Sequence, residues 1–171
     1  MKRWKENRPA DICFARGTFN AHPVVMSAMK AFLDEIEKPE IQALYEGLDE
    51  RWNQRCEKFN HTMRNFDFPI QATNMSSVWT ISYTQPGRYH WLFQFYLRAE
   101  GLALSWVGTG RLIFSLNYGE TEFQAVLDRF VAAAKKMSED GWWWQNPQLT
   151  HRNIRLQILR ETLGWPEKTS D

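Results

Sequence analysis

The pair Gly17-Thr18 is the first place in this chain where the residue types suit the binding of an anion. A glycine lets the backbone approach a bound anion closely. A threonine hydroxyl and a free backbone N–H can both donate hydrogen bonds to phosphate oxygens. Taken alone, the pair is better explained as a plain turn, so its meaning depends on the residues around it.

Complete catalytic motifs are absent from the sequence. It contains no Gly-x-Ser-x-Gly, no P-loop and no His-Glu-x-x-His. The four histidines have no metal-ligand spacing, and we expect surface or helix-capping positions for all of them: His22, His61, His90 and His151. The two cysteines form no Cys-x-x-Cys and no disulfide framework. A reduced, cytoplasmic setting is the default for such a chain.

The balance of charge excludes some classes of partner. With 21 Lys and Arg residues against 20 Asp and Glu, the net charge is only +1. A nucleic-acid partner would favour a strongly basic face, so none is expected. No apolar run approaches the length of a membrane span, and the first eight residues do not resemble a secretory signal. We interpret the three consecutive tryptophans, Trp142 to Trp144, as core and subunit contacts rather than a ligand-stacking platform.

The hydrophobic pattern predicts helices and strands in an α+β order. Pro23 suits the first turn of a helix that ends at Lys38-Pro39. A second helix, starting near Pro39, carries one apolar stripe as far as Phe59. The pattern then predicts strands at 70–73 and 78–83, a helix at 89–99, strands at 102–107 and 112–116, and helices at 120–137 and 150–163.

This order predicts a small, mainly antiparallel sheet with helices packed on one side. The last two strands are separated by Gly108-Thr109-Gly110, which fits a hairpin or a tight ligand loop.

The run from Gly17 to Pro23, Gly-Thr-Phe-Asn-Ala-His-Pro, stands before the first helix. It resembles a motif of class III pyridoxal-phosphate aminotransferases. In that family the threonine reaches across a homodimer and binds the phosphate of the cofactor held by the other subunit. The resemblance implies that Gly17 and Thr18 bind pyridoxal 5′-phosphate, and that the parent enzyme is a homodimer acting on a small amino acid or keto substrate.

The resemblance extends to about residue 138 and implies three parts. Residues 1–38 resemble a remnant of the large cofactor domain with its linking helix. Residues 39–138 resemble the C-terminal small domain of fold-type I aminotransferases. Residues 139–171 lie beyond the usual family end and are expected to form an appended helical extension.

The segment from Arg111 to Phe123 keeps the family's register of an arginine, apolar residues and an acidic helix start. Several class III enzymes use an arginine at this register to bind the substrate carboxylate, which a planar guanidinium grips with two hydrogen bonds. Arg111 is therefore a candidate substrate-binding residue, and a surface arginine at a strand start is the alternative. At Phe114-Ser115 the chain departs from the Pro-Pro that many members carry.

Two features bear on the activity that the resemblance implies. The His22-Pro23 ending and the strand pattern favour the glutamate-1-semialdehyde aminomutase-like branch, although members of that branch often lack an arginine at the position of Arg111. The family's Schiff-base lysine lies before the Gly-Thr motif, and a Gly-rich run follows the lysine. Neither Lys2 nor Lys5 is followed by glycine.

We therefore expect a C-terminal fragment of an aminotransferase that is inactive alone, with no catalytic residue of its own. The parent reaction is amino-group transfer between an amino acid and a carbonyl compound, or an aminomutase-type isomerisation. The alternative is a non-catalytic interaction or dimerisation module that retains the small-domain fold.

Overall fold

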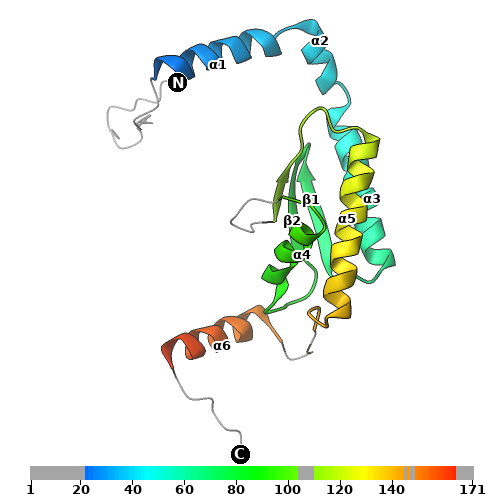
Figure 1. Cartoon of the computed structure of the whole chain (residues 1–171), viewed down its shortest axis with the longest axis vertical. Coiled ribbons are helices and arrows are strands. Elements are labelled where there is room, and N and C mark those ends of the chain that lie inside the picture. The colour runs from blue at the N-terminus through cyan, green and yellow to red at the C-terminus, as the bar shows by residue number, and fades with distance from the viewer. Residues whose placement is uncertain (1–21, 104–109, 145, 147–148, 165–171) are drawn as a thin grey trace, which may run out of the picture. The chain divides into compact units, whose positions relative to one another are not determined.

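The computed structural model of the chain describes residues 22–103, 110–144, 146 and 149–164 (Figure 1). These residues fall into two compact units, which divide between Glu46 and Gly47. The Gly17-Thr18 pair lies outside the described residues. So do residues 104–109, which include most of the predicted strand at 102–107 and the Gly108-Thr109 link.

The N-terminal unit is helical. Helix α1 (Pro23–Ile36) and helix α2 (Pro39–Gln42) both begin with a proline, whose missing N–H costs nothing in the first turn. A short 3₁₀ helix, η2 (Ala43–Tyr45), follows. None of the residues of α1 is buried, so its predicted apolar face lies open, including Met29 and Phe32.

The predicted continuous helix from Pro39 to Phe59 is wrong. The structure interrupts it at Gly47, which adopts a left-handed conformation with φ 63° and precedes helix α3 (Leu48–Asn65). Glycine adopts this conformation without steric cost, so the chain can change direction there. The apolar residues of α3 are the ones that enter a core, namely Trp52, Cys56, Phe59 and Met63.

The C-terminal unit is built on a three-stranded antiparallel sheet in the order β1-β2-β3. Its strands are β1 (Ile70–Met75), β2 (Val78–Tyr83) and β3 (Arg111–Ile113). The first two are joined by the two-residue turn Ser76-Ser77, with Ser76 at φ 51°. The alternating burial of β1 and β2 shows that only one face of the sheet enters the core.

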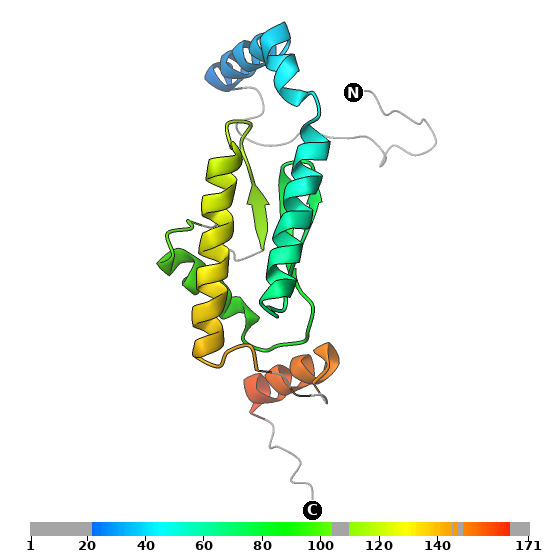
Figure 2. The same cartoon turned by 90° about the vertical axis from the view of Figure 1, so that its right-hand side faces the viewer.

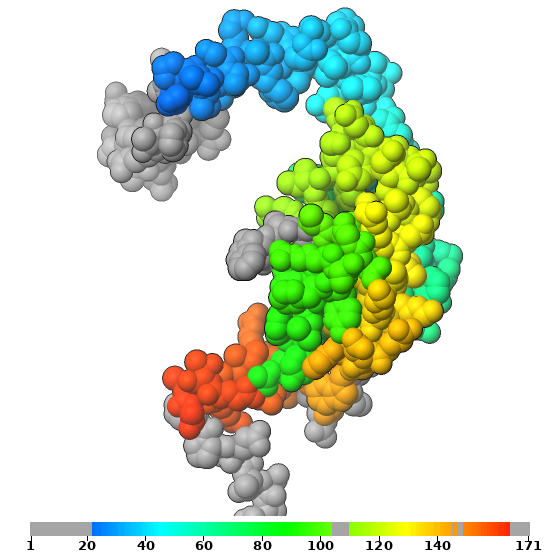
Figure 3. All heavy atoms as spheres, viewed as in Figure 1, coloured from blue at the N-terminus to red at the C-terminus, as the bar shows by residue number. Residues whose placement is uncertain are grey.

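Helices cover that face. Helix α3 packs against β1 and helix α5 (Glu120–Glu139), and η3 (His90–Leu92) leads into helix α4 (Phe93–Ala99), which packs against α5 (Figures 1 and 2). In the space-filling view the side chains of α4 and α5 adjoin (Figure 3). Helix α6 (His151–Leu163) completes the unit, with Thr150 capping its first turn. The predicted α+β class, with helices on one side of a small antiparallel sheet, is confirmed.

Trp79 of β2 lies at the centre of the core. Four rings surround it with centroid distances of 5.3–5.9 Å: Trp52, Phe59, Phe114 and Phe123. All four meet it edge-on, the orientation that aromatic quadrupoles favour. These rings come from α3, α5 and the residue that follows β3, so one side chain links the sheet to both long helices.

Asn60 of helix α3 closes the outer edge of strand β1. Its side-chain amide accepts a hydrogen bond from the backbone N–H of Ala72 at 2.7 Å and donates one to the carbonyl oxygen of Ala72 at 2.9 Å. An edge strand normally leaves such groups free for pairing with another chain. Here a side chain of the same unit satisfies them.

The tryptophan run divides between the core and the surface. Trp143 packs near Tyr83, His90 and Phe93, and its Nε1 donates to the carbonyl oxygen of Ala134 at 3.0 Å. Trp142 and Trp144 are exposed. The core position expected for the run therefore holds for Trp143.

The expectation of a surface or capping position for His90 is wrong, because its side chain is only 8% exposed. The ring stacks on Tyr83 with a centroid distance of 4.2 Å. It also lies so close to Gly87 that a Cβ there would approach Nε2 to 2.2 Å. Burial, with a smaller contribution from the charge of His151, lowers the pKa of His90 to about 4.

We predict that the chain loses stability as the pH falls from about 6.5 to about 4. The unfolded state takes up a proton on His90 near its ordinary pKa of 6.5, whereas the folded state takes it up only near 4. The contribution is therefore complete above 6.5 and lost below it, to a total of roughly 3 kcal/mol. Urea unfolding of wild type and of His90→Leu across this range measures it. A slope that is equally steep in the variant would contradict the assignment.

Candidate functional site

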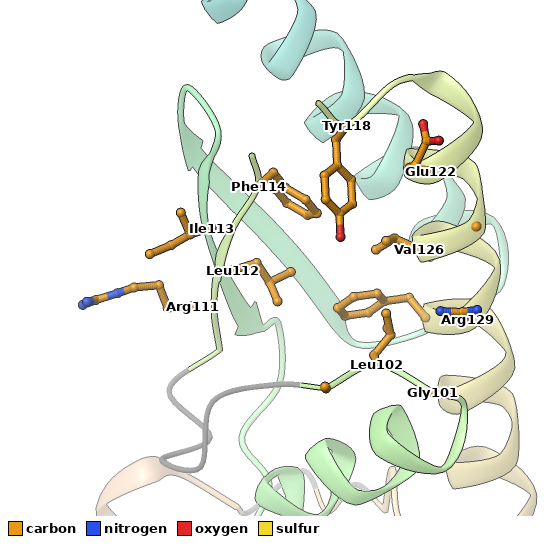
Figure 4. A pocket seen from close by; sticks show the side chains of 13 residues that line it. Gly101, Leu102, Arg111, Leu112, Ile113, Phe114, Tyr118, Glu122, Val126 and Arg129 are labelled. Atoms are coloured by element: carbon orange, nitrogen blue, oxygen red, sulfur yellow. The ribbon is translucent and has the colours of Figure 1, made fainter. Parts of the chain in front are cut away.

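Arg111, the predicted substrate-binding residue, is the first residue of strand β3 and is exposed. It projects from the face of the sheet that the helices do not cover. Figure 4 shows Arg111 and Ile113 on one side of the strand and Leu112 and Phe114 on the other. This is the alternation expected of a strand.

Two threonines lie in line with Arg111 across the open face. The register pairs Arg111 with Thr80 of β2, and Thr80 with Thr73 of β1. Both threonines are exposed, as the alternation of their strands requires. Directly opposed residues in an antiparallel sheet have Cβ atoms about 4.5–5.5 Å apart. The row therefore places a guanidinium and two hydroxyls side by side on one face, across three neighbouring strands, and we call it the polar row.

The polar row suits a carboxylate better than a metal ion or a phosphate cluster. The guanidinium can donate two parallel hydrogen bonds to one carboxylate, and the hydroxyls can donate to its remaining lone pairs. Among the described residues, Arg111 has no side-chain hydrogen bond or ion pair to another group. No described group therefore occupies its donors. The predicted cofactor residues Gly17 and Thr18 lie outside the described residues, so their distance from this row is not defined.

An apolar row lies beside the polar one. Ile113 pairs with Val78, and Val78 pairs with Met75. Ile113 is 73% exposed and Met75 is 78% exposed, large values for side chains of these types. The open face thus offers hydrogen-bond donors next to apolar surface. The alternation along each strand predicts from the sequence which residues share a face. Which residues of different strands lie next to one another depends on the strand register, which the structure provides.

Gly110 fixes the position of Arg111. It has φ 69°, and its carbonyl oxygen accepts a hydrogen bond from the N–H of Ile81 at 2.7 Å. A Cβ on Gly110 would lie 2.6 Å from the carbonyl oxygen of Ile81. Both the backbone conformation and the close approach to β2 therefore require glycine.

Phe114, where the sequence resemblance would place a proline, takes part in the strand pairing through its backbone. Its backbone N–H donates to the carbonyl oxygen of Ser77 at 3.0 Å, a bond that proline could not make. Its ring is buried and stacks on Trp52 with a centroid distance of 4.7 Å. The substitution therefore extends the pairing of β3 and adds a ring to the core.

A hollow of about 500 Å³ lies on the other side of β3, between that strand and helix α5. Arg111, Leu112, Phe114 and Val126 are among the residues that line it, and the end of the Arg111 side chain extends away from helix α5 (Figure 4). Glu122, at its rim, already accepts a hydrogen bond from the N–H of Gly119 at 2.9 Å, which satisfies a backbone donor at the start of helix α5. The hollow and the polar row therefore adjoin at Arg111.

The part of the chain that the structure describes contains no group of three or more His, Cys, Asp or Glu side chains that could hold a metal ion. Nor does any helix within it have the length and apolar character needed to cross a membrane.

We predict that Gly110→Ala destabilises the chain by about 2–4 kcal/mol, because a side chain there adopts a strained conformation and clashes with β2. Gly141→Ala is the matched control. Gly141 also has a positive φ, of 76°, but its Cβ would meet no atom within 4 Å, so strain alone should cost about 1–2 kcal/mol. Urea unfolding compares the two. Equal losses would show that the close approach to Ile81 is unimportant.

Comparison with known proteins finds a likeness of fold among solved structures. No family model and no curated protein sequence matches the chain. Among solved structures, it is similar to the crystal structure of an omega-transaminase from Sphaerobacter thermophilus, with a TM-score of 0.56 and 22% sequence identity. The match covers 72% of this chain but only 30% of the transaminase chain. The chain thus has the fold of part of a transaminase, in agreement with the predicted small C-terminal aminotransferase domain.

Proposed function

We propose that this chain is the C-terminal part of a pyridoxal-phosphate-dependent transaminase and supplies its small domain. The observation that carries the proposal is the likeness of fold to an omega-transaminase over most of the chain. The Gly17-to-Pro23 motif supports it independently, because it comes from the sequence alone. In the parent enzyme, pyridoxal phosphate supplies the electron sink for transfer of an amino group.

The described residues fit substrate binding but not covalent attachment of the cofactor. The polar row fits the binding of a substrate carboxylate. Covalent attachment of the cofactor requires a lysine amine held in a protected site. Every described lysine is exposed, on a helix surface or, for Lys38, between helices α1 and α2: Lys30, Lys38, Lys58, Lys135 and Lys136. We therefore assign the Schiff-base lysine to another part of a longer polypeptide, consistent with the 30% coverage of the transaminase chain.

In this proposal the open face of the sheet borders the substrate cleft. Arg111 binds the substrate carboxylate, assisted by Thr80 and Thr73 of the polar row. Gly17 and Thr18 bind the phosphate of the cofactor in the partner subunit of a homodimer, and the enzyme is cytoplasmic. Amino-group transfer is preferred over the aminomutase reaction because Arg111 is present and because the similar structure is a transaminase.

The coding DNA upstream of the chain tests the proposal most directly. We expect an in-frame continuation that encodes a strand-end lysine followed by a Gly-rich run. The full-length protein should then form a borohydride-reducible adduct with pyridoxal phosphate on that lysine and transfer an amino group. In it, Thr18→Ala should weaken cofactor affinity by roughly 10- to 150-fold, the loss of one charged hydrogen bond. A stop codon upstream and an inactive native protein would instead support the non-catalytic module.

We further predict that Arg111→Lys, in the full-length enzyme, lowers kcat/KM for amino acids by about 10- to 150-fold. Lysine keeps the charge but loses the planar fork. Activity toward simple amines, which have no carboxylate, should hardly change. Arg129→Lys is the control, because Arg129 is an exposed arginine on helix α5. Steady-state kinetics with both substrate types measures the effect, and equal losses on the two would assign Arg111 a structural role.

A further inference from the structure

Helix α6 presents apolar side chains on the side opposite its buried residue. Its inner face is marked by Ile154, the only residue of the helix that is buried, and by Glu161, which pairs with Arg88 of the segment after β2. One hydrogen bond of this pair, from Nη1 of Arg88 to Oε1 of Glu161, measures 2.6 Å. These contacts fix which side of α6 faces its own unit.

Three leucines form a seam on the outer side. Leu156, Leu159 and Leu163 follow one another at intervals of three and four residues, so they lie on one face of the helix. Their helical positions are roughly opposite that of Ile154. They are 42%, 48% and 52% exposed. In the space-filling view α6, in orange and red, lies at the surface (Figure 3). We call these three residues the leucine seam.

Arginines surround the leucine seam. Arg152 lies in line with it, one turn before Leu156, and Arg155 and Arg160 lie on its two sides. Among the described residues none of these three arginines forms an ion pair. The single acid of α6, Glu161, is already engaged by Arg88. The outer face of α6 therefore combines a narrow apolar strip with three arginines that no described residue pairs.

We propose that the leucine seam and its arginines bind an acidic amphipathic helix of a partner protein. Leucines at intervals of three and four residues are the anchors by which one helix packs along another. Arginines flanking such a seam pair with carboxylates at the corresponding positions of the partner. The helix is about 20 Å long, enough for nearly two heptads of contact.

Charge and width favour this occupant over two others. Two α6 helices packed seam to seam would bring their arginines together, so a second copy using the same face is disfavoured. A membrane-surface helix buries a broad apolar face, whereas this seam is a single narrow strip bordered on both sides by charge. The proposal does not depend on the transaminase assignment.

A synthetic acidic peptide tests it on the full chain. The peptide has about three heptads with Leu at positions a and d and Glu at e and g, so that its own charges oppose self-pairing. A matched basic peptide carries Lys at e and g. Fluorescence anisotropy of the labelled peptides should show binding of the acidic one only. Failure of the acidic peptide to bind, or equal binding of both peptides, would overturn the proposal.

Variants locate the surface. Leu159→Ser and Arg155→Glu should each weaken binding of the acidic peptide by about fivefold or more. Lys135→Glu, an equal charge reversal at an exposed position on helix α5, should change it by less than about twofold. Leu156→Gln should weaken binding as well, and glutamine has a high helix propensity, so α6 should remain helical in this variant. Circular dichroism measures the helix content and checks this. Unchanged binding by the α6 variants would overturn the proposal.

The same variants distinguish the other occupants. Co-sedimentation with vesicles of phosphatidylserine and phosphatidylcholine reports membrane binding. Sedimentation velocity reports self-association. If Leu159→Ser abolishes vesicle binding or dimer formation while the acidic peptide does not bind wild type, the occupant is a membrane or a second copy, and the proposal is wrong.

Discussion

Burial of Trp79 is the constraint on which the rest of the C-terminal unit depends. Its ring meets rings from helix α3, from helix α5 and from Phe114 after strand β3. Such edge-to-face contacts are directional as well as apolar, so they restrict angles and not only distances. The two long helices and the sheet therefore have few alternative ways to pack. Phe114 belongs to this set, which explains why an aromatic residue at that position is compatible with the fold.

The aromatic core also determines which residues face outward. Neighbouring residues of a strand point to opposite sides of the sheet, so burial of Trp79 places Thr80 on the open face. Burial of Phe114 places Ile113 there in the same way. A slip of one residue in the pairing of β2 would expose the tryptophan and bury a threonine in its place. The polar row is thus set by the packing on the opposite side of the sheet, and changes in the core would alter the open face.

The spacing of apolar residues, together with residues that begin or end helices, was enough to predict most of the elements. Pro23, Thr150 and Gly164 mark helix ends by their own backbone chemistry, and strands β1 and β2 follow from their β-branched and aromatic residues. The break at Gly47 could not be predicted, because a glycine within a helical pattern is compatible with either outcome. Burial of His90 depends on its fit beside Gly87 and Trp143, a contact between segments that no local pattern contains.

The candidate site divides in the same way. Arginine at a strand start was visible in the sequence, and so was its chemical suitability for a carboxylate. Its companions Thr80 and Thr73 were not, because they depend on the register of three strands. Which face of the sheet is open depends on where the helices pack, and the apolar residues of β3 alone are compatible with either face. Gly17 and Thr18 remain predictions from the sequence.

Because of the hydrogen bonds between Asn60 and Ala72, the two edges of the sheet differ in how readily they can pair with a further strand. At this point of β1 the outward-facing backbone donor and acceptor are already occupied by a side chain of the same unit, so an incoming strand would first have to displace it. The opposite border, formed by β3, has no comparable side-chain clamp among the described residues. Strand exchange between molecules, or the first step of fibril formation, therefore meets no described side-chain clamp at β3. An asymmetric barrier of this kind would let the sheet accept a strand on one side while resisting uncontrolled polymerisation on the other.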